Sequence, residues 1–410
     1  MTIAAPPALR DIAYRGFHLP TDRTAGSDDG LRATERGLTP DGADQSVARG
    51  SWTSPPVRVG FPVAEVVPSW TADTPDGCWI EVELRGWHGD APSTGWYLLA
   101  RWAADDHAVR RTSVPGQRDG DARVDTDTLM VAGAAVTGWQ ARVTLFRPPG
   151  SPAGPVLRSI GAVATGQMPT DPAGGPGGAA DGPPAAGPAA EPPTGARPVP
   201  ELPTGAGRGR VLDVPRYSQR LHTGQHPQWG GGGDSWCSPT CTSMVLAYWG
   251  VEPAPERYAW VEPPGPRPVV VHAARHCYDH GYAGAGNWPF NTAYAGLHGV
   301  DAFVTRLRSL AEAEAFIAAG IPLIVSAAFR ADEVPGLAYD TRGHLMVLVG
   351  FTADGDPVLN DPYAPDDDAV RRTVPRQRFE VAWQRGSGGV AYVLRPASVP
   401  LPPPPAQANW

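Results

Sequence analysis

Apolar and polar residues alternate in short runs through the first 165 residues of this 410-residue chain. In CWIEVELRGW, residues 78–87, every second residue from Ile80 to Leu84 is apolar, so these side chains share one face of an extended segment. The runs IAYRGF, GWYLLARWA, TLMVAG and WQARVTLFR also read as strands, separated by turn clusters such as HGDAPST. This pattern predicts an all-β sandwich or jelly roll over residues 10–165, after a disordered N-terminus at residues 1–9.

Helical signals follow in the second half of the chain. Pro239 lies just inside the start of SPTCTSMVLAYWG and Gly250 lies at its end, which predicts a helix with Ser238 as its cap. Ser309 and Glu312 form a capping-box pattern that predicts a second helix.

Strand-like runs come after the second helix, namely IPLIVSAAF, HLMVLVGF, DPVLNDP and GGVAYVL. Helices followed by a mostly antiparallel sheet predict an α+β domain over residues 209–397. The remaining residues, 398–410, end in LPPPPAQANW and are expected to form an extended, disordered Pro-rich tail.

The two patterned halves are separated by residues 166–208, which are almost wholly Pro, Gly, Ala and small polar residues without an aromatic side chain. Such a segment cannot bury enough apolar surface to offset the entropy of ordering its backbone. The sequence therefore predicts a flexible linker between two independently folding units.

Charge and hydropathy exclude several classes of protein. Acidic residues outnumber basic ones by 42 to 34, which argues against nucleic-acid binding through a basic face. The longest apolar runs are shorter than the roughly 18 residues that a membrane-spanning helix needs, so no membrane association is expected. Because no secretory signal is visible, the cytoplasm is the default compartment, with secretion as the alternative. The four cysteines are too few for a disulfide scaffold and are expected to be free thiols.

One cysteine combines the features of a nucleophile. Cys237 precedes Pro239 at the start of the predicted helix, where free backbone N–H groups and the helix dipole stabilise a thiolate. His344 opens the strand HLMVLVGF and is the best proton carrier among ten histidines. The next strand ends in Asn360 and Asp361, and only one of these neighbours can face His344, since successive side chains of a strand point to opposite faces.

An oxyanion hole requires a second donor beside the backbone N–H of Cys237. Gln219 in VPRYSQ is one candidate, and Gln225 and Gln228 in the following loop are alternatives. The glycine run 230–233 would let this loop fold close to the active face.

These segments resemble a known family. In order, VPRYSQ, DSWCSPTCTSMVLAYWG, GHLMVLVGF and VLNDPY are similar to the papain-like peptidases of cysteine peptidase family 39, the double-glycine leader peptidases and their stand-alone actinobacterial relatives. The resemblance covers about residues 211–396. It implies these roles: Cys237 as nucleophile, His344 as general acid and base, Asp361 as orienting carboxylate and Gln219 as oxyanion donor.

The β-rich half resembles the same group, because GSWTSPPVR, VPSW and the later segment GNWPFNTAYAG are similar to actinobacterial members that pair a β-rich domain with the peptidase. Two features depart from the leader peptidases. Ser238 follows the cysteine where they usually have Gly, and the transporter to which they are fused is missing. Processing of a double-glycine leader is therefore not expected.

Three patterns of histidine and aromatic residues each admit two interpretations. His272, His276 and His280 recur every four residues beside Cys277, which could form a zinc site on a helix or simply place histidines at the negative end of its dipole. Seven tryptophans lie in the β-rich half and could bind sugar rings or fill a core. Trp288 and Phe290 could line a substrate groove or pack in the core.

Together these patterns predict a cysteine peptidase that hydrolyses peptide bonds in a peptide or protein substrate without a cofactor or metal. A cell-wall glycan or peptide could bind the N-terminal domain. One alternative is a glycan or cell-wall binding protein with an inactive peptidase-like half. Another is an amidase or transpeptidase that acts on peptidoglycan.

Overall fold

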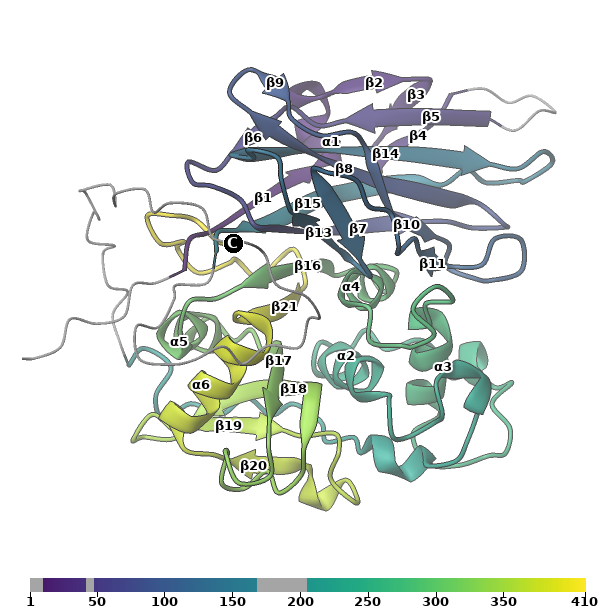
Figure 1. Ribbon diagram of the computed structural model, residues 1–410. Coiled ribbons are helices and arrows are strands. Elements are labelled where there is room, and N and C mark those ends of the chain that lie inside the picture. Colours follow the sequence, from purple (N-terminus) through teal and green to yellow (C-terminus); the bar gives the residue numbers. More distant parts are fainter. Residues whose placement is uncertain (1–9, 42–47, 168–204) are drawn as a thin grey trace, which may run out of the picture.

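The computed structural model describes residues 10–41, 48–167 and 205–410. Figure 1 shows a β-rich N-terminal domain above a C-terminal domain that combines helices with one sheet. The predicted disordered N-terminus, residues 1–9, and most of the predicted linker lie outside the described residues.

The described part of the N-terminal domain contains two antiparallel sheets. The strand order is β12-β13-β7-β15-β4-β3 in one sheet, with β1 beside β15, and β11-β10-β8-β14-β5-β2 in the other, with β6 beside β14 and β9 beside β8. The elements are β1 (Ile12–His18), α1 (Leu19–Asp22), η1 (Arg23–Ala25), β2 (Ser27–Asp29), β3 (Leu31–Thr34), β4 (Gly37–Pro40), β5 (Ala48–Thr53), β6 (Val57–Arg58), β7 (Glu65–Asp73), β8 (Trp79–His88), β9 (Ala91–Pro92), β10 (Tyr97–Trp102), β11 (Thr112–Ser113), β12 (Ala122–Asp125), β13 (Thr128–Val131), β14 (Gly138–Arg147) and β15 (Val156–Thr165).

The alternation seen in the sequence determines the core of this domain. Ile80, Val82 and Leu84 of β8 are fully buried, whereas the residues between them are half-buried. Four tryptophans also lie in the interior with at most 1% of their surface exposed: Trp52, Trp70, Trp102 and Trp139. Trp79 stacks on Phe146 with 4.6 Å between ring centroids. These tryptophans therefore pack against the protein itself.

The C-terminal domain begins with helices and continues into a six-stranded antiparallel sheet of order β16-β21-β17-β18-β19-β20. This arrangement confirms the α+β prediction. Its elements are η2 (Gln219–His222), η3 (Pro227–Trp229), α2 (Cys237–Tyr248), η4 (Pro255–Tyr258), α3 (Pro268–Cys277), α4 (Trp288–Gly296), β16 (Asp301–Arg306), α5 (Leu310–Ala318), β17 (Leu323–Phe329), β18 (Thr341–Phe351), β19 (Pro357–Asn360), η5 (Asp368–Val370), β20 (Arg371–Thr373), α6 (Arg376–Ser387) and β21 (Val390–Arg395). Among the described helices, none is long and apolar enough to cross a membrane.

The starts of two helices differ in detail from the prediction. Helix α2 begins at Cys237, with Trp236 rather than Ser238 at the cap position. At α5 the Ser309 side chain makes no capping bond. Glu312 instead accepts hydrogen bonds from the backbone N–H of Arg308, at 2.8 Å, and from its guanidinium, at 2.9 Å.

The final residues correct the prediction of a disordered tail. Trp410 is 8% exposed and packs edge-on against Phe316 with 4.9 Å between ring centroids. The buried Asn409 side chain donates to the backbone carbonyl of Arg306 at 2.7 Å and to Glu312 at 2.8 Å. The proline run suggested an unpacked segment, but a terminal aromatic ring and a buried amide hold this part of the chain on the domain surface.

The two domains also pack closely against each other. Phe290 of α4 is fully buried between Trp70 and Trp102 of the N-terminal domain, with ring centroids 6.1 and 5.4 Å away. Tyr14 of β1 stacks on Phe303 of β16 at 4.6 Å. Apolar surface is thus shared between the domains, and a linker composition says nothing about such contacts.

Polar contacts fix the segment between α3 and α4 to the N-terminal domain. The buried Arg111 guanidinium donates to the carbonyl oxygens of Arg275 at 2.9 Å and Tyr278 at 3.2 Å. Asp127, in the turn between β12 and β13, accepts the backbone N–H of Trp288 at 2.9 Å. This segment forms one wall of the site described next.

Candidate active site

Cys237 is the first residue of α2 and is half-buried. The preceding loop turns sharply because Gly230, Gly231 and Gly232 adopt φ values of 91°, 88° and 73°, which glycine reaches without steric cost. Burial raises the pKa of the Cys237 thiol, but the hydrogen bond and charge of His344 and the backbone N–H groups of Leu345 and Ser238 outweigh this effect. The net pKa lies below its ordinary value, which favours a thiolate.

His344 lies near the start of β18 and is 5% exposed. Its Nε2 atom is 2.8 Å from Oδ1 of Asp361, and its ring also has a hydrogen bond to Cys237. Burial lowers the pKa of His344, yet these two partners raise it to about 10. The raised pKa favours a protonated imidazole between the Cys237 sulfur and the Asp361 carboxylate.

Asp361 follows β19 directly and is 1% exposed. Burial raises the pKa of this carboxyl group, but His344 and the backbone N–H of Tyr363 hold the net pKa below the usual value. Asn360 faces the other side of the strand. Its Nδ2 atom donates to the carbonyl of Pro215 at 3.0 Å, and its Oδ1 atom accepts from Arg371 at 3.0 Å. Of the two neighbours, Asp361 is the one that contacts the imidazole.

Two tyrosines that the sequence analysis did not single out cover the imidazole. The Tyr339 ring stands edge-on to His344 at 5.5 Å and tilts against Tyr363 at 4.7 Å. Burial and the neighbouring Asp361 raise the pKa of the Tyr339 hydroxyl far above its ordinary value. These rings limit the access of water to the His344–Asp361 pair. Tyr363 lies two residues after Asp361 in NDPY, but nothing in the sequence marks Tyr339.

Gln219 is buried at the start of η2, on the loop that precedes Cys237. Its backbone N–H donates to Pro362 at 2.9 Å, and its Nε2 atom donates to the carbonyl of Gly233 at 2.5 Å. A side-chain amide has two N–H donors, and within the described ranges Gly233 is the only partner of this nitrogen, so one N–H can serve another acceptor. The alternative Gln225 is engaged with His222 at 3.2 Å, and Gln228 is exposed.

Cys237 and His344 line a cavity of 610 Å³. Loop residues contribute most of its walls, and Gly230 of the glycine run lines it, as expected. The full lining set is Gly230, Asp234, Ser235, Cys237, Tyr282, Ala283, Gly284, Ala285, Gly286, Trp288, Ser326, Tyr339, Asp340, Thr341, Gly343, His344, Leu345 and Tyr363. Trp288 therefore borders the cavity, whereas Phe290 packs at the domain interface.

Comparison with known families agrees with this architecture. Residues 14–165 match the model of the peptidase C39 N-terminal domain, and residues 211–390 match the model of the peptidase C39-like family. The chain is a relative of the C39-like cysteine peptidases. Both matches confirm the resemblance seen in the sequence. A search of curated proteins found no match.

Solved structures give only weak likenesses. The complex of a serine protease from Aeromonas sobria with its chaperone ORF2 has 15% identity and a TM-score of 0.21, and the alignment covers 40% of this chain and 28% of that one. TmCBM61 in complex with β-1,4-galactotriose has 10% identity and a TM-score of 0.15, covering 37% and 83% of the two chains. These scores are too low to support an argument about this C39-like chain.

The remaining thiols of this C39-like protein have different surroundings. All four cysteines are free, as expected. Cys241, one turn after Cys237, is buried and donates to the carbonyl of Leu345 at 3.3 Å. Burial raises the pKa of both Cys241 and Cys277. Ser238, where leader peptidases usually have Gly, is buried with its hydroxyl 3.0 Å from that of Tyr392, so it faces the sheet.

The histidine pattern does not form a metal site in the described part of the chain. His272 and His276 stack on α3 with 4.0 Å between ring centroids, while His280 lies beyond the helix, 3.9 Å from Asp106. In the ranges 10–41, 48–167 and 205–410, no group of three or more His, Cys, Asp or Glu residues is arranged to hold a metal ion.

Proposed function

We propose that this C39-like protein is a papain-like cysteine peptidase that hydrolyses amide bonds in a peptide or protein substrate. The observation that carries the proposal is the chain of contacts from Cys237 through His344 to Asp361, beside a 610 Å³ cavity. In this proposal residues 209–397 form the peptidase domain and residues 10–165 the accompanying β-sandwich.

The first half of the reaction forms an acyl-enzyme. The Cys237 thiolate attacks the carbonyl carbon, and the electron pair of the C=O double bond moves to the oxygen. The free N–H of Gln219 and the backbone N–H of Cys237 stabilise the oxyanion. As the tetrahedral intermediate collapses, the C–N bond breaks and His344 gives its proton to the leaving amine.

The second half regenerates the thiolate. Neutral His344 removes a proton from a water molecule, whose oxygen attacks the thioester carbonyl. The C–S bond then breaks, the acid product leaves, and the thiolate again faces a protonated imidazole. Asp361 holds the imidazole in one orientation and stabilises its positive charge throughout.

Digestion of unfolded casein by the full-length protein tests this proposal. Mass spectrometry of the products should detect new peptide termini with the wild-type protein and none with Cys237→Ala. Equal cleavage by Cys237→Ala would contradict the proposal. Muropeptide products from peptidoglycan, with casein left intact, would instead favour an amidase or transpeptidase. Glycan binding by the N-terminal domain remains a prediction, which a glycan-binding assay with the same variant can test.

A further inference from the structure

The cavity beside Cys237 adjoins a second cavity of 350 Å³ that lies between the domains. Both are lined by Tyr282, Gly286 and Trp288. The second cavity is also lined by the following residues: Glu65, Asp125, Thr126, Asp127, Thr128, Met130, Asn287 and Arg306. The β12–β13 hairpin of the N-terminal domain thus forms part of one surface with the candidate active site.

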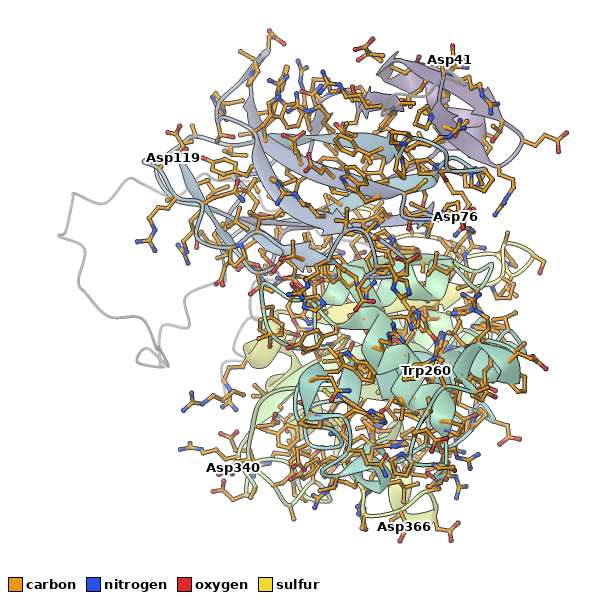
Figure 2. All side chains as sticks on the ribbon, turned by 90° about the vertical axis from the view of Figure 1, so that its right-hand side faces the viewer. Asp41, Asp76, Asp119, Trp260, Asp340 and Asp366 are labelled. Carbon is orange, nitrogen blue, oxygen red and sulfur yellow. The ribbon has the colours of Figure 1, made fainter. Side chains whose placement is uncertain are left out.

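In Figure 2, Asp119, which shortly precedes β12, and Asp340 lie on the same side of the two domains. Asp340 lines the cavity of Cys237. A substrate that leaves this cavity in the direction of the hairpin meets both domains.

Negative charge predominates along this surface. Asp234 and Asp340 line the first cavity, and Glu65, Asp125 and Asp127 line the second. Among the lining residues, Arg306 is the only lysine or arginine, and its guanidinium pairs with Glu65 at 2.7 Å. Glu65 also pairs with the nearby Arg10 at 3.2 Å, and Asp234 lies 3.8 Å from Arg220. Among the described residues, the lining aspartates without an arginine partner are Asp125, Asp127 and Asp340.

Two further features indicate a site that receives a peptide. Arg306 is 5% exposed, and its Nε–H has no partner in the described part of the chain, although its terminal nitrogens bind Glu65 and the carbonyl of Ser387. An unpaired buried donor is costly, and a substrate carbonyl would satisfy it. At the junction of the two cavities the Tyr282 ring is 50% exposed, so it can contact a bound peptide.

The walls of this surface are preorganised. Asp127 holds the backbone of Trp288, and Asp279 accepts the N–H of Ser113 at 2.8 Å, so the N-terminal domain fixes the loop at both ends. Asn287 caps α4 through Phe290 and donates to Asp279 at 2.9 Å. A rigid wall reduces the entropy that a bound peptide must overcome.

We propose that the substrate peptide runs from Cys237 past Tyr282 and Trp288 to the β12–β13 hairpin, where the interdomain subsite binds an arginine or lysine side chain. This inference rests on the proposed peptidase function and names its substrate class. The carboxylates receive the positive side chain, and Arg306 donates to a backbone carbonyl of the same peptide.

Binding to the Cys237→Ala protein tests the subsite separately from catalysis. The probes are fluorescein-labelled Gly/Ser decapeptides with two central arginines, alanines or glutamates, and the readout is fluorescence anisotropy. The arginine peptide should bind about tenfold more tightly than the alanine peptide, and added salt should reduce this difference.

Variants of the hairpin then locate the site. Asp125→Asn, at an exposed position, should weaken binding of the arginine peptide about three- to fivefold and leave the alanine peptide unchanged. Asp354→Asn is the matched control, since it removes one exposed carboxylate from the β18–β19 turn, at the opposite end of β18 from His344. It should have no effect.

Equal affinity for the arginine and alanine peptides, or equal losses from Asp125→Asn and Asp354→Asn, would overturn the subsite. A wild-type protein that cleaves casein without preference for basic residues near the scissile bond would also overturn it, and the peptidase function would stand. Binding of the arginine peptide without any cleavage by wild type would instead contradict the peptidase function.

Discussion

Two cysteines of the C-terminal domain lie at opposite ends of helices. Cys237 is the first residue of α2, beside His344 and an open cavity. Cys277 is the last residue of α3, fully buried, where the N-terminal domain covers the helix end with Arg111. The pKa of Cys237 lies below its ordinary value, and that of Cys277 lies well above it because burial dominates. The reactivity of a thiol in this domain therefore depends on which helix end it occupies, on the nearest cation and on the access of solvent.

Replacing each of these two cysteines by alanine should give the largest difference in kcat. Cys237→Ala is expected to lower kcat for peptide hydrolysis by about 10⁴-fold or more, because the nucleophile is lost. Cys277→Ala should change kcat less than about twofold, since Cys277 lies outside the cavity of Cys237. Initial rates with one fluorogenic peptide measure both. Comparable losses in the two variants would remove the distinction between the thiols.

Asp361→Asn should have the next largest effect. Loss of the carboxylate lowers the pKa of His344 and its preference for one orientation, so kcat should fall by about 10²- to 10⁴-fold with little change in KM. Asp354→Asn serves as the charge-matched control. A kcat within a factor of about three of wild type would show that Asp361 does not position His344.

Arg111→Met tests the domain contact that covers the end of α3 at Cys277. Its guanidinium donates to the partly buried carbonyls of Arg275 and Tyr278, and the substitution removes both hydrogen bonds together with a buried charge. The free energy of unfolding, measured in urea, should fall by about 3 kcal/mol, or about 150-fold in the unfolding equilibrium. Arg110→Met, at the exposed neighbouring position, is the control and should change it by less than about 0.5 kcal/mol. Equal losses of unfolding free energy in the two variants would show that the hydrogen bonds of Arg111 do not stabilise the protein.

The dependence of kcat/KM on pH tests the charge of the imidazole beside Cys237. Because the pKa of His344 is raised to about 10, the protonated imidazole that serves the leaving amine persists up to that pH. Above about pH 10 the imidazole loses this proton, and kcat/KM should decrease about tenfold for each pH unit. In Asp361→Asn this alkaline limb should move to lower pH. A limb near pH 6.5 in the wild type would contradict the paired imidazole.

The smallest expected effect concerns the residue after the nucleophile. Ser238→Gly removes a buried hydroxyl that lies 3.0 Å from the Tyr392 hydroxyl, so the free energy of unfolding should decrease by about 1 kcal/mol. Because Ser238 faces the sheet, kcat/KM should stay within about threefold of wild type. A larger kinetic change would show that this position shapes the cavity.

The sequence was sufficient to predict what depends on local pattern. Alternation predicted β8, and the Pro239 and Gly250 punctuation predicted α2 with Cys237 at its start. Strand geometry showed that only one of Asn360 and Asp361 could face His344, but the register that selects Asp361 depends on pairing between β18 and β19. Such pairing is set by the whole sheet.

Contacts between distant segments could not be predicted. The burial of Trp410 against Phe316 depends on how the chain returns to α5, and a proline run gives no sign of it. Tyr339 lies in a loop that reaches His344 only through the folded sheet. The domain interface at Phe290 likewise joins residues that are far apart in the sequence, such as Trp70 and Phe290.

Alkylation of the native protein by iodoacetamide between pH 5 and pH 9, with mass mapping of all four cysteines, tests the central claim most directly. Cys237 should react at pH 6 at least about tenfold faster than Cys78, Cys241 or Cys277, because its thiolate is already present beside a protonated imidazole. If Cys237 reacts no faster at pH 6 than the buried thiols, the sulfur is not held as a thiolate, and the proposed chemistry is contradicted.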